Sequence, residues 1–257
     1  MSSCSDVSFA TLQSLANVNL QMLPKHAQST RSQILNLSVV VGKLSGLFMS
    51  HPPVERSQSH EVQRNVQGCT TDSPSSFVAH PLIESAMGDT LWALCQTGSS
   101  CNLDLRCCVL KKVQLNARKY PVDLCKGKAG KYTTYSKETG ITKEKGQSTM
   151  EEGMHNDKMQ SIKEISVMIN QFSTERLWDQ YHTPRNLVLA LIGELGELSE
   201  LFQWKGDGEY LLTNEELDKV GQELADITIY LLRLAHVCSS QIGEVTMKTA
   251  NEAIVQR

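Results

Sequence analysis

Four carboxylates in the second half of the chain are the residues best suited to chemistry. Glu194 and Glu197 lie three positions apart, and Glu223 and Asp226 repeat this spacing further along. On a helix, side chains three apart emerge on one side, so each pair can converge on one ion. Two antiparallel helices could bring the pairs face to face as hard oxygen ligands, which suit Mg²⁺. One such pair alone is usually a solvated helix face, and the repetition beside apolar stripes is what favours a metal site.

The segments that carry these carboxylates have helical periodicity. Apolar residues recur every three or four positions in 162–172, 187–202 and 217–234. Pro184 suits the first turn of one helix, and Thr213 begins a sequence typical of a capping box. Two glycines, Gly206 and Gly208, are expected to end the helix that starts at Pro184. No alternation with period two competes, so the predicted fold class is all-α, an antiparallel helical bundle.

Composition limits the remaining classes of function. Residues 151–257 carry 9 Lys+Arg against 18 Asp+Glu, and this acidic balance suits divalent cations. No basic run is interleaved with aromatic residues, so nucleic acid is not an expected partner. No stretch approaches the ~20 apolar residues of a membrane span, so no membrane partner is expected either. Seven of the eight cysteines precede residue 150 without zinc-type spacing, which favours reduced thiols and a cytosolic location.

The residues around the carboxylates form a longer pattern. It consists of WDQYHTPRN at 178–186, GELGELSELFQW at 193–204 and ELADITIY at 223–230. Over about residues 160–245 it resembles the MazG-like all-α nucleotide pyrophosphatases, and within them the dCTP pyrophosphatase branch. The resemblance implies Mg²⁺-dependent hydrolysis of dCTP, and of related or modified nucleoside triphosphates, to the monophosphate and pyrophosphate in nucleotide-pool sanitation. It also implies a homo-oligomer, either a dimer or a tetramer.

The same resemblance implies roles for individual residues. The four carboxylates would hold the metal, and Glu197 would also orient or deprotonate the attacking water. The residues expected to contact the substrate are Trp178, Asp179, Gln180, Tyr181, His182, Trp204 and Tyr230. Ile169 stands where related animal enzymes have a histidine, so the base preference stays open. The alternative is a purely structural role, because a tryptophan at helical spacing is commonly a core residue.

The first half of the chain contains traces of a second copy of the motif. The sequence GKLSGLF at 42–48 matches GELSELF at 196–202. In this register Val40 replaces Glu194 and Lys43 replaces Glu197. A second register, which aligns Cys101 with Cys238, places Asp89 on Asp226 but Ala86 on Glu223. A metal site of this type is therefore not expected in the first copy. The predicted organisation is a degenerate copy in 1–135 with 51–78 irregular, a polar linker in 126–160, and a pyrophosphatase domain in 161–257.

The first copy keeps one helix that the second lacks. KVQLNARKYP at 112–121 resembles the family's closing helix, which implies phosphate-binding roles for Lys112, Asn116, Lys119 and Tyr120. The second copy has Thr249, Ala253, Gln256 and Arg257 at these positions. Three interpretations are open. The first copy completes the site of the second, the enzyme is weak because its phosphate contacts are missing, or the chain is an inactive pseudo-enzyme that acts as a helical oligomerisation subunit.

Overall fold

A computed structural model describes residues 7–55, 77–128, 161–205 and 212–255 of the chain. Within these ranges the chain is almost entirely helical, which confirms the predicted all-α class. The short strands β1 (Val54–Glu55) and β2 (Phe77–Val78) pair antiparallel. The helices are α1 (Phe9–Met22), α2 (Lys25–Gln28), α3 (Thr30–Ser50), α4 (Pro81–Ser100), α5 (Leu105–Lys119), α6 (Val122–Cys125), α8 (Ile162–Glu175), α9 (Pro184–Glu200), α10 (Asn214–Val237) and α11 (Ile242–Val255).

Local capping determines where the helices of the second half begin. α9 starts at Pro184 with Thr183 as its N-cap, and Thr213 forms the predicted capping box with Glu216 at the start of α10. The predicted end of α9 was wrong, because the helix stops at Glu200, before the glycines. There the N–H of Leu201 donates to the carbonyl of Leu198, and such bonds three residues apart tighten the chain into turns.

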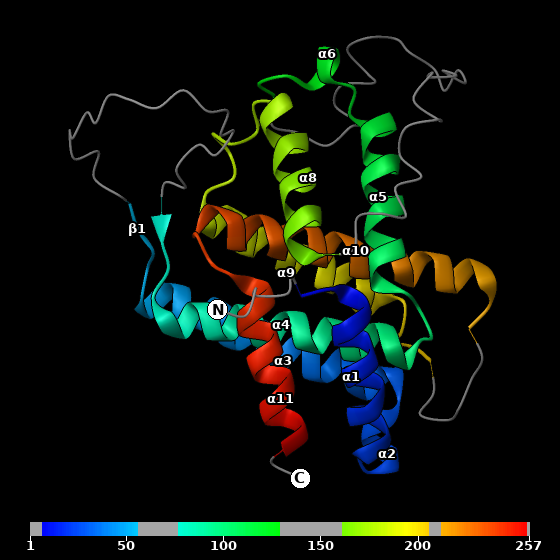
Figure 1. Ribbon diagram of the computed structural model, residues 1–257. Coiled ribbons are helices and arrows are strands. Elements are labelled where there is room, and N and C mark those ends of the chain that lie inside the picture. Colours follow the sequence, from blue (N-terminus) through cyan, green and yellow to red (C-terminus); the bar gives the residue numbers. More distant parts are fainter. Residues whose placement is uncertain (1–6, 56–76, 129–160, 206–211, 256–257) are drawn as a thin grey trace.

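One helix of each half of the chain packs against a long helix of the other half. α3 packs against α4 and α9 packs against α10, so each half has its own pair of long helices. α5 belongs to the first half but packs on α10, whereas α11 belongs to the second half and packs on α4. Figure 1 shows α5 and α8 standing on one side of the long helices, with α1 and α11 on the opposite side. This exchange decides which residues reach the candidate site.

Buried apolar residues from both predicted copies form one hydrophobic core. The first turns of α1 and α8 meet, where the N–H of Ile162 donates to the carbonyl of Val7 at 2.9 Å. α11 lies so close to α4 that a Cβ added at Gly88 would be 2.7 Å from Cγ1 of Val245. A larger side chain at that position would force the two helices apart, so the glycine is needed for the exchange of α11.

Parts of the predicted irregular stretch and linker can be located. Residues 54–55 and 77–78 form the short strand pair, while 56–76 lie outside the described residues. Of the predicted polar linker, residues 126–128 are described and 129–160 are not. Val122–Cys125, which carried no prediction of its own, forms the short helix α6 beside the end of α5.

Among the described helices, α3 alone is long and apolar enough, by length and composition, to cross a membrane. It has 21 residues and a mean hydropathy of 1.3, contrary to the expectation that no stretch is sufficiently apolar. A single helix of this kind is weak evidence, since core helices pass the same test. Leu37, Val41 and Leu44 of α3 are buried in the core, and 33% of the apolar window of this helix is buried.

Candidate functional site

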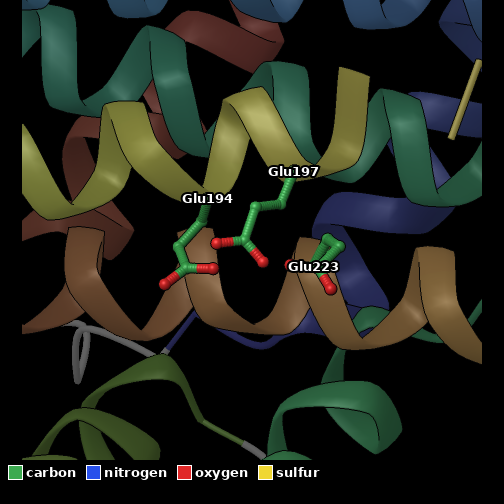
Figure 2. A group of neighbouring side chains, drawn as sticks. All are labelled: Glu194, Glu197 and Glu223. Carbon is green, nitrogen blue, oxygen red and sulfur yellow. The ribbon is translucent and has the colours of Figure 1, made fainter. Parts of the chain in front are cut away.

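Three of the four predicted carboxylates converge. Glu194 and Glu197 project from α9 and Glu223 projects from α10, and their carboxylates point toward one another between the two helices (Figure 2). One oxygen from each lies within 4.8 Å of the others. Asp226, the fourth predicted ligand, is not part of this group. Its carboxylate instead forms an ion pair with Lys112, with 2.5 Å between Nζ and Oδ2.

The surroundings of these carboxylates favour a cation. Burial, together with the charges of Asp226, Glu197 and Glu223, raises the pKa of Glu194 to about 7. Burial also raises the pKa of Asp226, against the opposing effect of Lys112. Oε2 of Glu223 is buried and accepts no hydrogen bond from the described residues. Repelling carboxylates and an acceptor without a donor are conditions that a hard cation relieves, so these residues fit Mg²⁺.

A pocket of about 280 Å³ adjoins this cluster, between α5, α8, α9 and α10. Glu194 lies at the boundary, because it belongs to the cluster and also lines the pocket. The other lining residues are Lys112, Val113, Asn116, Lys119, Tyr120, Lys128, Ile169, Phe172, Ser173, Trp178, Tyr181, His182, Asp226, Ile229, Tyr230 and Arg233. The pocket therefore has a charged end near the carboxylates and a largely aromatic end away from them.

The first half of the chain supplies the basic wall of this pocket. Lys112, Asn116 and Lys119 are spaced by four and three on α5, so they share one face of that helix, and all three line the pocket. The side chains of Lys112 and Asp226 are 14% and 15% exposed. Asn116 also hydrogen bonds to Asp226. The exchange of α5 onto α10 thus brings the predicted phosphate-binding residues to the carboxylates of the other half.

The aromatic end of the pocket is built around Trp178. Its indole N–H donates to the carbonyl oxygens of Cys125 and Lys128, at 3.3 and 3.1 Å, so the segment after α5 holds the ring. Tyr120 meets the ring edge-to-face at 5.3 Å between centroids, and Phe172 does so at 5.9 Å. The sequence predicts Phe172 only as the last apolar residue of the helical segment 162–172. Such rings offer stacking surfaces for a flat ligand.

The predicted substrate-contact residues separate into two groups. Trp178, Tyr181, His182 and Tyr230 line the pocket, whereas Asp179, Gln180 and Trp204 do not. Trp204 is 89% exposed and lies among the turn residues that follow the end of α9. In the described structure, Trp204 therefore does not reach a ligand bound in this pocket.

Arg233 is a pocket residue that the sequence did not indicate. It is 4% exposed, and its guanidinium donates to Nδ1 of His182 at 3.2 Å and also to Oδ1 of Asn170 and Oδ1 of Asp179. Since His182 accepts at Nδ1, its ring is in the neutral form. One feature of the sequence could have indicated Arg233. It is a charged residue inside the apolar run LLRLAHV, at the end of the predicted helical segment 217–234.

The contact with Arg233 predicts a pH dependence of stability. Burial, and then the charge of Arg233, lower the pKa of His182 from 6.5 to about 4. The folded chain therefore binds this proton more weakly than the unfolded chain. The contribution of neutral His182 to stability is present above pH 6.5 and is lost as the pH falls toward 4.

The His182→Gln variant tests this dependence. It keeps an acceptor for Arg233 and is expected to lessen the drop in melting temperature between pH 7 and pH 5. Circular dichroism melts measure the effect, with exposed His26→Gln as the control. Identical drops in wild type and His182→Gln would contradict the assignment.

The corresponding place in the first half is filled by the chain itself. Asp89 of α4 accepts from Nζ of Lys43 at 3.2 Å and from Oγ1 of Thr249 at 3.1 Å. These two residues correspond to Glu197 and Lys112 in the sequence register. A lysine thus supplies positive charge beside Asp89, where the second half presents carboxylates.

Part of the chain is similar to known pyrophosphatases. It is 47% identical over 81 residues to dCTP pyrophosphatase 1 of Homo sapiens, which covers 30% of this chain and 48% of that protein. It is 46% identical over 90 residues to dCTP pyrophosphatase 1 of Mus musculus and 42% over 90 residues to that of Bos taurus, in each case 34% of this chain and 53% of the relative. The chain thus spans about half the length of the curated relatives it matches. No protein-family model matches it.

Proposed function

We propose that this chain hydrolyses dCTP-like nucleoside triphosphates to the monophosphate and pyrophosphate, with Mg²⁺ as its cofactor, in cytosolic nucleotide-pool sanitation. One observation carries the proposal. The carboxylates of α9 and α10 and the basic face of α5 border one pocket that also has an aromatic end. The similarity of part of the chain to dCTP pyrophosphatase 1 supports the same activity. Of the three interpretations open from the sequence, this placement favours completion of the site by the first half.

The pocket suggests how the substrate is oriented. Asp226, Tyr230 and Arg233 follow one another along the pocket side of α10, and the first and last are roughly 10 Å apart along the helix. The triphosphate would lie at the Asp226 end, where Lys112 and Lys119 donate to phosphate oxygens. The base would lie at the other end, against Trp178 and Tyr230.

Each residue then has a defined task. Mg²⁺ held by Glu194, Glu197 and Glu223 would neutralise charge on the triphosphate and would lower the pKa of water. Glu197, whose side chain is exposed, orients the attacking water and accepts its proton on a carboxylate oxygen. Lys112 leaves Asp226 and donates to the departing pyrophosphate, which stabilises its growing charge. The aromatic rings hold the nucleoside so that the α-phosphorus faces the water.

The test is a screen of ribo- and deoxynucleoside triphosphates with the full chain. Pyrophosphate release is measured with Mg²⁺, with Mn²⁺ and with a chelator, and we expect metal-dependent turnover of dCTP or a related triphosphate. An absence of turnover with every triphosphate and both metals would refute the proposal. The alternative is then an inactive helical oligomerisation subunit, and one observation favours it. Lys112 forms an ion pair with Asp226, so the chain itself neutralises one of the four carboxylates.

We also propose that the chain forms a homo-oligomer, a dimer or a tetramer. The outer faces of α3 and α9 carry exposed apolar side chains, and the most exposed are Met49, Leu35, Val39 and Leu189 at 87%, 69%, 69% and 67%. Exposed apolar residues that gather on neighbouring helices favour association. Light scattering of the full chain measures the assembly, and a monomer at every concentration would refute it.

A further inference from the structure

Arg233 is a buried charge at the aromatic end of the pocket. Its side chain is 5% exposed, and its one carboxylate partner among the described residues is Asp179, whose side chain is 47% exposed. Taking a guanidinium out of water costs several kcal/mol, and a single half-exposed partner offsets this cost only in part. An arginine in such a place is poorly explained by packing, because an apolar residue would fill the same space without the cost.

The hydrogen bonds of Arg233 leave part of its donor capacity unused. A guanidinium has five N–H groups. Nε donates to His182, Nη1 to Asn170 and Nη2 to Asp179, which uses one N–H on each nitrogen. The second N–H of each Nη has no partner among the described residues. Two N–H groups on neighbouring nitrogens of a planar fork match a ligand edge that has two adjacent acceptors.

The position of Arg233 says which part of a nucleotide would meet these donors. It lies on the pocket side of α10, one turn beyond Tyr230 and two turns from Asp226, and so at the end away from the carboxylates. Ile169, beside it in the pocket lining, is 2% exposed and has no polar group to read a base. Asn170, Asp179 and His182 come from α8 and the turn after it, and their hydrogen bonds fix the position of the guanidinium.

We propose that Arg233 determines which base the pocket accepts, and that it selects a nucleobase edge with two adjacent hydrogen-bond acceptors. The N3 and O2 atoms of cytosine form such an edge, and so do the N7 and O6 atoms of guanine. Adenine places its amino group beside N1 and N7 and has no second acceptor next to N3, and thymine and uracil place an N–H between their two carbonyls, so these bases satisfy one donor and leave the other unpaired. The inference rests on the proposed function only in that the pocket takes a nucleotide.

Direct binding of nucleoside monophosphates tests this inference without requiring turnover or a metal. Isothermal titration of the full chain with dCMP, dGMP, dAMP and TMP is expected to give at least about tenfold tighter binding of dCMP and dGMP. The Arg233→Met variant should lose this preference, and Arg233→Lys, which keeps the charge but not the planar fork, should lose most of it. Equal affinities in the wild type, no binding of any monophosphate, or an unchanged preference in Arg233→Met would each overturn the inference.

A second buried arginine provides the matched control. Arg176 is also 4% exposed and donates to the carbonyls of Tyr120 and Phe172, but it does not line the pocket. Arg176→Met is expected to lower the melting temperature while leaving the ratios among the four monophosphates unchanged. If Arg233→Met weakened the binding of all four monophosphates by the same factor, Arg233 would have only a structural role and the inference would be wrong. Selective binding by a chain without any turnover would refute the proposed hydrolysis and leave this inference standing.

Discussion

The Glu194→Gln variant is expected to lower kcat/KM for Mg²⁺-dependent pyrophosphate release by at least about 100-fold, or ~2.7 kcal/mol of transition-state stabilisation. Glu194 is the only residue that belongs both to the carboxylate cluster and to the pocket lining among the residues the structure describes. The substitution keeps the size of the side chain and removes one charged oxygen from the group that would hold the cation. Pyrophosphate release at saturating Mg²⁺ measures the loss.

The same variant has a second readout that does not depend on activity. Since the charges of Asp226, Glu197 and Glu223 disfavour ionised Glu194, its neutralisation should make the metal-free chain melt at a higher temperature. Mg²⁺ should then raise the melting temperature less than it does in the wild type. Glu200→Gln is the control, because Glu200 is exposed on the last turn of α9 and outside the cluster. If Glu194→Gln kept the turnover of the wild type and the same rise in melting temperature with Mg²⁺, the proposed metal site would be wrong.

The carboxylate cluster could be predicted because it depends on short-range geometry. Glu194 and Glu197 share a face of α9 by helical spacing alone, and α9 and α10 are successive helices that pack together. Bringing Lys112 to Asp226 requires instead that α5 cross to the other half of the chain. Periodicity records which face of α5 is apolar and not which helix will cover it. The sequence therefore left the contribution of α5 as one of three interpretations.

Other features were missed for related reasons. Arg233 interrupts an apolar run, and its partners Asn170 and Asp179 lie more than fifty positions away, so no local pattern connects the three. The position of Trp204 depended on where α9 ends. Gly206 and Gly208 predict a later end, but hydrogen bonds between residues three apart end the helix at Glu200. Helix ends are decided by such local competition among carbonyl acceptors, which composition does not resolve.

The Lys112→Met variant is expected to raise KM for the triphosphate by about 10- to 100-fold, the range for the loss of a charged hydrogen bond. Methionine keeps most of the apolar stem, so packing of α5 on α10 should persist while the ammonium is lost. Asp226 then has no cation beside it, and its carboxylate is mostly buried. The metal-free variant should accordingly melt at a lower temperature, and it should bind Mg²⁺ more tightly, because no lysine competes for Asp226. Steady-state kinetics and titration with Mg²⁺ alone measure the two effects separately.

The adjacent residue offers a matched control for this prediction. Lys111 also forms an ion pair across to α10, with Asp218 at 2.5 Å, but the two side chains are 60% and 45% exposed and neither lines the pocket. An exposed pair of this kind contributes about 0–1 kcal/mol to stability, so Lys111→Met should leave KM and Mg²⁺ affinity unchanged. The contrast between neighbours on one helix separates the loss of any ion pair between α5 and α10 from the loss of the one that faces the substrate. An unchanged KM in Lys112→Met would mean that the first half does not complete the site, and the weak or inactive interpretation would then hold.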